Sequence, residues 1–266
     1  MSKLFKRVVE VITEGVRMNN TNLDIEFEIP FDDDLDPNIS EITIYNLSNT
    51  TRNMITRGKL LTINAGYEGD KGLILSGYIN SVNTKHENAD KPTIIKVSDS
   101  KPLDADKTLQ KSFKKGIKAE QILRELAKVL GLSIAVLILP KNKAFAKGFA
   151  IDGEILKAMQ DISKDCGAAC YISRSKLFIR SLKIGDDHRF VLNRDTGLVG
   201  SPEYFEEEKD NRTIKGYKVN SLLQYRMNTA SIIELQSIGV KAKVRVSKGK
   251  HICRGDSFYT EVEAIL

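Results

Sequence analysis

The stretch Leu23-Asp24-Ile25-Glu26-Phe27-Glu28-Ile29 alternates without exception between apolar and acidic side chains. Successive side chains of a β-strand point to opposite faces, so this pattern places the apolar groups on one face and the carboxylates on the other. No other part of the sequence carries so clear a strand signal. The stretch therefore predicts a strand with one face in a core and the other in water.

The surrounding residues, 1–102, continue this β pattern. Further strands are predicted at residues 42–47, 59–65, 73–82 and 93–99. Turn-forming residues such as Asp36-Pro37-Asn38 separate them. One short helix is expected in between, with Ser48 or Asn49 as its N-cap and Gly58 just beyond its end. The spacing of the strands predicts a small barrel or sandwich.

The middle segment, residues 103–184, changes to helical periodicity. Two groups of apolar residues each form one stripe of an amphipathic helix: Ile122, Leu123, Leu126, Val129 and Leu130, then Ile155, Leu156, Met159, Ile162 and Cys166. Gly131 and Gly167 follow as helix stops. A strand at 132–139 and a hairpin of 169–173 with 177–182 complete a small α+β module.

The last segment, residues 185–266, returns to strands. Residues 240–247 alternate between small apolar and mostly basic side chains, which predicts a half-buried strand with a basic outer face. Turns are expected near Gly239 and at Lys248-Gly249-Lys250. Partner strands are predicted at residues 217–223, 231–236 and 258–265. The predicted fold class is α+β, mainly β, with β domains at 1–102 and 185–266 flanking the module at 103–184.

Composition narrows the class of protein further. The chain has 266 residues, 41% of them hydrophobic, and a net charge of +6, which permits contact with an acidic surface without demanding it. Three cysteines are too few to staple such a chain, so a reducing compartment is expected. The longest apolar run, 134–139, is far shorter than the about 20 residues that span a bilayer. We expect an intracellular protein without membrane insertion.

Residues that could carry catalysis or bind a metal are sparse. The three histidines, His86, His188 and His251, lie in different predicted regions, and Cys166 and Cys170 have no second cysteine pair to complete a zinc site. We predict no metal, no cofactor and no catalytic residue. A nucleophilic pair of Cys166 with His188 stays open as an alternative.

Two charged stretches need an interpretation. The acidic loop offers Asp32, Asp34, Asp36 and Asn38 as calcium ligands, but Pro37 stands where the EF-hand loop needs glycine, so a solvated loop is the preferred interpretation. A basic run follows further on, made of Lys107, Lys111, Lys114, Lys115 and Lys118. It has only Phe113 as an aromatic neighbour, so we interpret it as a solvated loop or a charged protein interface.

Two sets of segments resemble a known family. The first set comprises residues 36–48, 51–55, 61–67, 75–79 and 97–99. The second set comprises residues 197–202, 217–223, 244–251 and 258–263. They resemble the first and second β domains of phage baseplate hub proteins, the family that includes relatives of late control protein D and hub proteins of phage-tail-like bacteriocins.

The resemblance implies a structural role. Both β domains would have a tail-tube-like barrel fold, and three chains would close a pseudo-sixfold ring that joins the sixfold tail tube above to the threefold spike below. The implied partners are two further copies, the tube protein, the spike protein and other baseplate proteins, with DNA present only in transit. The chain would belong to the baseplate of a virion or tail-like particle assembled in the bacterial cytoplasm. Since the sequence ends at Leu266, soon after the second β domain, the spike is expected to be a separate chain.

Two other functions remain as alternatives to a non-enzymatic hub. One is a cell-wall hydrolase component of the tail that uses a cysteine or a carboxylate. The other is a nucleic-acid-binding module that uses the run from Lys107 to Lys118. For the hub itself, the candidate interface loops are residues 31–38 and 201–210.

Overall fold

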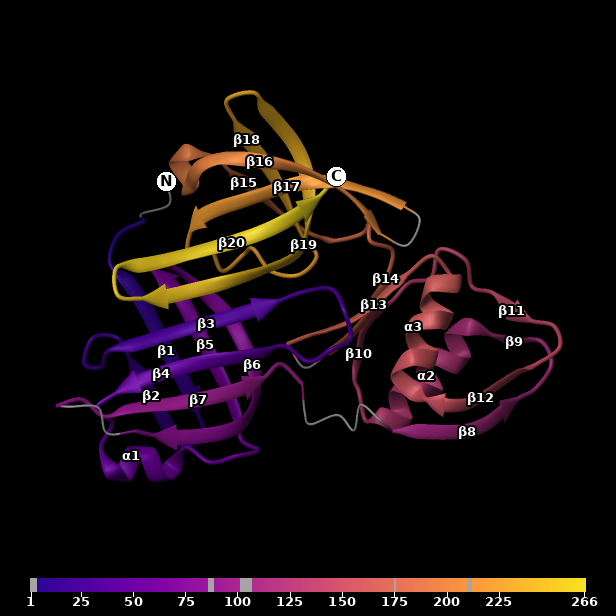
Figure 1. The fold of residues 1–266 in the computed structure, drawn as a ribbon, viewed down its shortest axis with the longest axis horizontal. Helices are drawn as coiled ribbons and strands as arrows, with labels where there is room; N and C mark the ends of the chain where they lie inside the picture. Colours follow the sequence, from indigo (N-terminus) through magenta and orange to yellow (C-terminus); the bar gives the residue numbers. More distant parts are fainter. Residues whose placement is uncertain (1–3, 86–88, 101–106, 175, 210–211) are drawn as a thin grey trace. The chain divides into compact units, whose positions relative to one another are not determined.

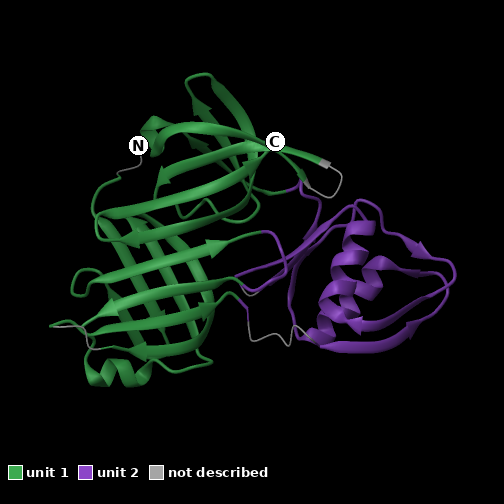
Figure 2. Cartoon of the chain, in the orientation of Figure 1, with its two compact units in different colours: residues 1–32, 38–99, 185–266 green, residues 33–37, 100–184 purple. Residues whose placement is uncertain are grey.

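The structure is a computed structural model that describes residues 4–85, 89–100, 107–174, 176–209 and 212–266. Of the residues it describes, 58% lie in strands and 13% in helices, which confirms the predicted α+β, mainly β class. The chain forms two compact units, distinguished by colour in Figure 2. Unit 1 comprises residues 1–32, 38–99 and 185–266, and unit 2 comprises residues 33–37 and 100–184. The division into three domains stays a prediction.

Unit 1 is built from two groups of strands. The first group is β1 (Arg7–Thr13), β2 (Val16–Asn19), β3 (Ile25–Phe31), β4 (Ile39–Tyr45), β5 (Leu60–Tyr67), β6 (Asp70–Thr84) and β7 (Pro92–Ser98). The second group is β15 (Asp186–Leu192), β16 (Leu198–Lys209), β17 (Arg212–Leu222), β18 (Ser231–Ser237), β19 (Val240–Arg254) and β20 (Ser257–Ile265). Helix α1 (Asn49–Met54) begins after Ser48, whose side chain accepts a hydrogen bond from the Thr51 amide, as predicted.

These strands form one continuous sheet in the order β16-β17-β20-β19-β3-β4-β7-β6-β5-β1-β2, with β18 and then β15 branching from β19. The predicted barrels are not confirmed, because no sheet among the described strands closes. A barrel requires its first and last strands to pair. Here β16 and β2 lie at the two ends of the sheet order.

The two groups of strands meet where β3 pairs with β19. The antiparallel ladder runs from Phe31 opposite Gly249 to Phe27 opposite Cys253. The strand predicted from the alternating stretch therefore lies at the centre of the sheet order. Its bounds, 25–31, begin and end two residues later than the predicted 23–29. Figure 1 shows β3 and β19 side by side.

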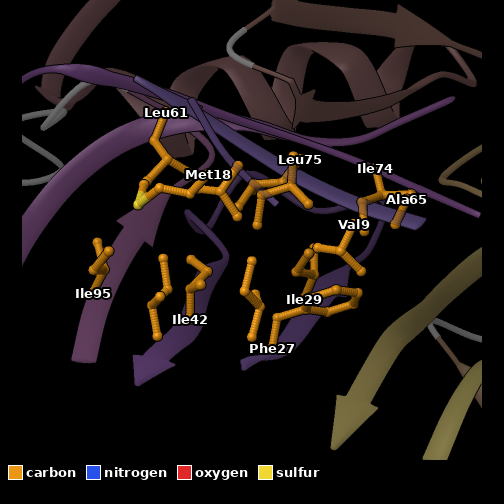
Figure 3. Close-up of a cluster of buried hydrophobic side chains, with 14 of the residues drawn as sticks. Val9, Met18, Phe27, Ile29, Ile42, Leu61, Ala65, Ile74, Leu75 and Ile95 are labelled. Atoms are coloured by element: carbon orange, nitrogen blue, oxygen red, sulfur yellow. The ribbon is translucent and has the colours of Figure 1, made fainter. Parts of the chain in front are cut away.

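A hydrophobic core accounts for the alternation of β3. Ile25, Phe27 and Ile29 are each at most 4% exposed and pack with residues of β1, β4, β5, β6 and β7, whereas Glu28 is exposed. Figure 3 shows Phe27 and Ile29 beside Ile42 in this cluster. The same cluster contains Leu223, which directly follows β17, and Phe258 of β20, so residues 185–266 also contribute to it. Burial of such side chains contributes about 1.5–3 kcal/mol each.

The predicted turn at Lys248-Gly249-Lys250 is wrong, because these residues lie inside β19. Gly249 pairs with Phe31 on one side and Val262 on the other. A Cβ at this glycine would lie 2.3 Å from the Glu261 carbonyl oxygen and 2.8 Å from Phe31 Cζ. The glycine therefore allows the neighbouring strands to approach closely. The strand is irregular just before it, where the register with β20 shifts between Val246 and Lys248.

Unit 2 contains the two predicted helices, α2 (Ala119–Leu130) and α3 (Ile155–Asp165). Its strands are β8 (Thr108–Phe113), β9 (Ile117–Lys118), β10 (Ile134–Leu137), β11 (Ala144–Phe145), β12 (Phe149–Glu154), β13 (Ala169–Ser173) and β14 (Lys176–Arg180). Gly131 caps α2 in the left-handed conformation, with φ of 69°. The predicted apolar stripes face one core, which also contains Leu35 from the acidic loop. The predicted hairpin is confirmed as β13 and β14, while Ser175 in its turn lies outside the described residues.

Candidate assembly surface

The exposed face of the central strands of unit 1 carries a row of ion pairs, which we call the ion-pair ladder. Glu263 on β20 bridges Lys218 on β17 at 3.7 Å and Lys248 on β19 at 3.0 Å. Lys250 on β19 continues the row to Glu28 on β3 at 3.5 Å. The hydrogen bond to Glu263 raises the pKa of Lys248, so this ammonium stays charged across the physiological range.

The ion-pair ladder arises from strand pairing. Lys218 and Lys248 both stand opposite Glu263 in the antiparallel registers, and Lys250 stands opposite Glu261. Opposite charges directly across a sheet stabilise it weakly, by about 0.2–1 kcal/mol per pair. The ladder therefore specifies register and charge balance on this face more than it adds stability.

A hollow of about 510 Å³ opens on the same face of unit 1. Phe31, Gly249 and Val262 line it together with the ladder lysines and glutamates, and Ser201 and Glu203 of β16 also contribute. The lining combines these paired charges with apolar surface from Pro30, Phe31 and Val262, a mixture that is typical of protein–protein contact surfaces.

The edge strand β16 is the second feature of this surface. Residues 198–209 form a strand paired only with β17 among the described strands, so the predicted loop at 201–210 is wrong for residues 201–209, and Asp210 lies outside the described residues. A register shift between Val199 and Glu203 surrounds Pro202, which lacks an amide donor and is compatible with an edge strand. Tyr204 is 53% exposed on it. An edge this long is a template for pairing unless it is covered.

The other predicted interface loop, residues 31–38, is more ordered than a solvated loop. The Leu35 side chain is fully buried in the core of unit 2. Asn38 donates from Nδ2 to Asp32 Oδ1 at 3.1 Å, and the Asp34 carboxylate accepts from the Asp36 amide at 2.9 Å. Among the residues that the structure describes, no group of three or more His, Cys, Asp or Glu is placed to hold a metal ion.

A second set of polar contacts fastens the loop after β17 to the first group of strands. Arg226 donates to both oxygens of the Asp70 carboxylate, at 2.7 and 3.1 Å, and its guanidinium lies 4.3 Å from the Tyr225 ring centroid. Gly72 on β6 leaves room for that ring, because a Cβ there would lie 2.2 Å from Tyr225 Cδ2. Hydrogen bonding to Asp70 raises the pKa of Arg226.

We expect Asp70→Asn to lower the free energy of unfolding by about 1–2 kcal/mol, because a half-buried bidentate hydrogen bond to a charged group is lost. Urea unfolding followed by circular dichroism measures this. Glu68→Gln is the matched control. Glu68 forms an ion pair with Lys6, and because the two side chains are 66% and 73% exposed, this pair contributes little to stability. Equal effects of the two substitutions would contradict the assigned role of Asp70.

The cysteines in the described part of the chain are buried or partly buried, an environment that disfavours the reactive thiolate. Cys166 is buried in the core of unit 2, and His188 is an exposed residue of β15 in unit 1. Burial raises the pKa of the Cys170 thiol to about 12 and that of Cys253 to about 11. His251 is buried, with Nδ1 2.9 Å from Thr260 Oγ1, and His86 lies outside the described residues.

These thiols should therefore react slowly in the folded protein. At pH 7.5 we expect Cys166 and Cys170 to resist iodoacetamide until the protein is unfolded, because the thiolate is the reactive form and both groups are buried. Peptide mass spectrometry of native and urea-unfolded samples gives the comparison. Rapid native alkylation of Cys166 would restore the cysteine hydrolase as an alternative.

The basic run is partly neutralised. Lys111 pairs with Glu125 at 2.7 Å, and Lys107 donates to the Val129 carbonyl oxygen at 2.9 Å. The hydrogen bond from Lys111 lowers the pKa of Glu125. Lys114, Lys115 and Lys118 are exposed.

Comparison with solved structures extends over the whole chain. A tail protein from Neisseria meningitidis MC58 superposes with a TM-score of 0.68 at 11% identity, covering 98% of this chain and 97% of the other. The 43 kDa tail protein of prophage MuSo2 from Shewanella oneidensis gives the same TM-score and coverages at 9% identity. The chain has the fold of phage tail proteins. This confirms, at the level of the fold, the family resemblance predicted from the sequence.

The tail-protein fold also extends to a secretion machine. The E. coli c3393 protein, a type VI secretion component described as similar to the T4 tail proteins gp27 and gp5, has a TM-score of 0.62 at 11% identity. The match covers 96% of this chain and 76% of that one. No family model matches the sequence, and no curated protein matches it. Among the described residues, no helix is long and apolar enough to cross a membrane.

Proposed function

We propose that this chain is a non-enzymatic structural protein of a phage tail or tail-like particle, and that three copies form the baseplate hub between a sixfold tube and a threefold spike. The observation that carries the proposal is the whole-length match to two tail proteins, at 98% and 97% coverage. A match over both the continuous sheet and the smaller unit supports the same kind of structural building block.

The sheet supports assembly on physical grounds. Its sheet order ends at β16 on one side and at β2 on the other. Unpaired strand edges are aggregation hazards unless neighbouring chains cover them, and cyclic closure covers every edge of a ring with the same contact. In this proposal the tube-like barrels are completed by contacts between copies. The particle is assembled in the bacterial cytoplasm, with the tube protein, the spike and other baseplate proteins as partners.

The charge on the sheet fits the same role. The ion-pair ladder leaves the outer face of β17, β20, β19 and β3 strongly polar but internally compensated. Such a face can border water or a channel without attracting unrelated proteins through a single-sign field. The ion pair between Lys250 and Glu28 in this ladder forms only if β3 and β19 pair in the correct register.

Native mass spectrometry tests the proposal, on the chain alone and on the chain co-expressed with candidate spike and tube proteins. A threefold mass in either preparation, with ring-shaped particles in negative stain, is the expected result. A threefold mass only in the presence of the spike would mean that the spike templates the ring. A monomer in every preparation would overturn the hub proposal.

A further inference from the structure

Unit 2 brings together two lysine-rich segments that are far apart in the sequence. Residues 107–119 and 141–151 hold eight lysines and no Asp, Glu or Arg. Antiparallel pairing of β8 with β12 sets Phe113 opposite Phe149, and pairing of β9 with β11 sets Lys118 opposite Ala144. The structure thus adds a second basic segment to the run recognised in the sequence.

Five of these lysines form an exposed group without ion-pair partners among the described residues; we call it the lysine surface. Its members are Lys114, Lys115, Lys118, Lys141 and Lys147. Their backbone is held in place by hydrogen bonds from Gly116 and Gly148 to the Phe145 carbonyl oxygen, at 2.8 and 3.0 Å. By contrast, Lys111 is bound to Glu125 and Lys143 to Asp165, each at 2.7 Å.

The net charge of the chain resides in this unit. Unit 2 contains 17 Lys and Arg against 11 Asp and Glu, whereas unit 1 contains 24 of each, so unit 2 carries the whole excess of six positive charges. A like-charged group on a small unit creates a field that attracts polyanions and costs some stability through self-repulsion. The lysine surface is therefore a feature that folding alone does not account for.

The second segment adds Phe145 and Phe149 to Phe113, which is the single aromatic residue of the basic run in the sequence. Phe145 and Phe149 have ring centroids 4.5 Å apart, and both are only partly buried. Lys111 Nζ lies 5.5 Å from the Phe113 ring centroid, and Lys143 Nζ lies 5.4 Å from that of Phe145. Basic residues interleaved with aromatic ones are typical of nucleic-acid-binding surfaces.

We propose that the lysine surface binds the phosphate backbone of nucleic acid without sequence preference. Lysine is a point charge that suits phosphate, whereas protein interfaces are enriched in arginine and depleted in lysine. The lysines over Phe113 and Phe145 are Lys111 and Lys143, which Glu125 and Asp165 already engage, so the phosphate contacts are assigned to the five lysines of the lysine surface. This activity goes beyond the proposed hub role and does not depend on it.

Fluorescence anisotropy of the full chain with a labelled DNA duplex of roughly 20 base pairs tests the proposal. With four to five phosphates neutralised, we expect the affinity to fall about 100-fold or more when salt rises from about 50 to 200 mM. Lys114→Ala, Lys115→Ala and Lys147→Ala together should weaken binding at least about tenfold and reduce the log–log salt slope by about 3. Circular dichroism checks that the triple variant is folded.

A matched control removes the same charge elsewhere. Lys85, Lys91 and Lys241 are exposed residues of unit 1, and their joint replacement by alanine should leave most of the DNA affinity and its salt slope intact. Equal loss in both triple variants would overturn the assignment to the lysine surface. Absent or salt-insensitive DNA binding would overturn the proposal outright, and so would binding of polyglutamate in preference to DNA, which would identify an acidic protein as the partner.

Discussion

Gly249→Ala is expected to lower the free energy of unfolding by about 2–3 kcal/mol, because the added methyl group enters a fully packed strand interior. The new Cβ would lie 2.3 Å from a backbone oxygen of β20, 2.8 Å from Phe31 Cζ and 2.9 Å from Val262 Cγ1. Since β19 is paired on both sides here, neither neighbour can move without breaking a ladder. For a protein of this size the melting temperature should fall by about 5–10 °C.

Differential scanning calorimetry measures this shift. Lys250→Ala is the neighbouring control, because its pairs with Glu28 and Glu261, at 3.5 and 3.7 Å, are partly exposed and contribute about 1 kcal/mol or less. An unchanged melting temperature in Gly249→Ala would mean that β19 does not run straight through residues 248–250 beside β3.

Phe258→Ala is expected to have the largest effect, about 3–4 kcal/mol, because it removes a buried aromatic side chain and leaves a cavity. Phe258 is 3% exposed and belongs to the core of the first group of strands, with its ring 5.5 Å from that of Tyr67. Arg7 also lies 5.4 Å from the ring centroid. The substitution should therefore loosen both groups of strands, although the residue comes from β20.

Hydrogen exchange with mass spectrometry reads this out by segment. Faster exchange in peptides of β1 and β5 as well as β20 is the expected result. Faster exchange confined to residues 185–266 would instead support two independent β domains, as the three-domain prediction has it. Tyr204→Ala provides a size-matched control, since Tyr204 is 53% exposed and its loss should change stability by much less.

Local patterns in the sequence predict those helices and strands whose own residues carry a clear periodicity or cap. The alternation at 23–29 corresponds to β3, and the apolar stripes before Gly131 and Gly167 correspond to α2 and α3. The predicted Ser48 cap begins α1. In each case a short-range preference and the burial of one face agree, so neighbouring residues suffice. The resemblance to hub proteins is confirmed at the same coarse level, as a fold.

What the sequence does not predict depends on partners distant in the chain. Gly249 looks like a turn residue, and only the presence of Phe31 and Val262 on adjacent strands explains a glycine there. Pro202 and Glu206-Glu207-Glu208 resemble a loop because their apolar neighbours are few, yet β16 needs only one paired edge. The sequence does contain one hint of the ion-pair ladder. Lys248 and Lys250 are two residues apart, as are Glu261 and Glu263, so each pair lies on one face of its strand.

The lysine surface shows the same limit. The run from Lys107 to Lys118 is visible in the sequence, but Lys141, Lys147 and Phe149 join it only through pairing of short strands. Two-residue strands such as β9 and β11 carry no periodicity that could be detected. Surface chemistry that is assembled by such pairings is therefore predicted poorly from local pattern.

The pairing of β3 with β19 also sets an order of events during synthesis. Glu28 stands opposite Ile252, so the central ladder of unit 1 cannot form until the ribosome has added more than two hundred residues after β3. At translation rates of about 5–20 residues per second, the time between the synthesis of β3 and that of its pairing strand β19 is roughly 10–45 s. Unit 2 is almost entirely one continuous segment, 100–184, and can close during that wait. During this interval unit 2 can be folded while the backbone edge of β3 that later pairs with β19 is still unpaired. A chaperone or the strand of another nascent chain could pair with that edge before β19 arrives.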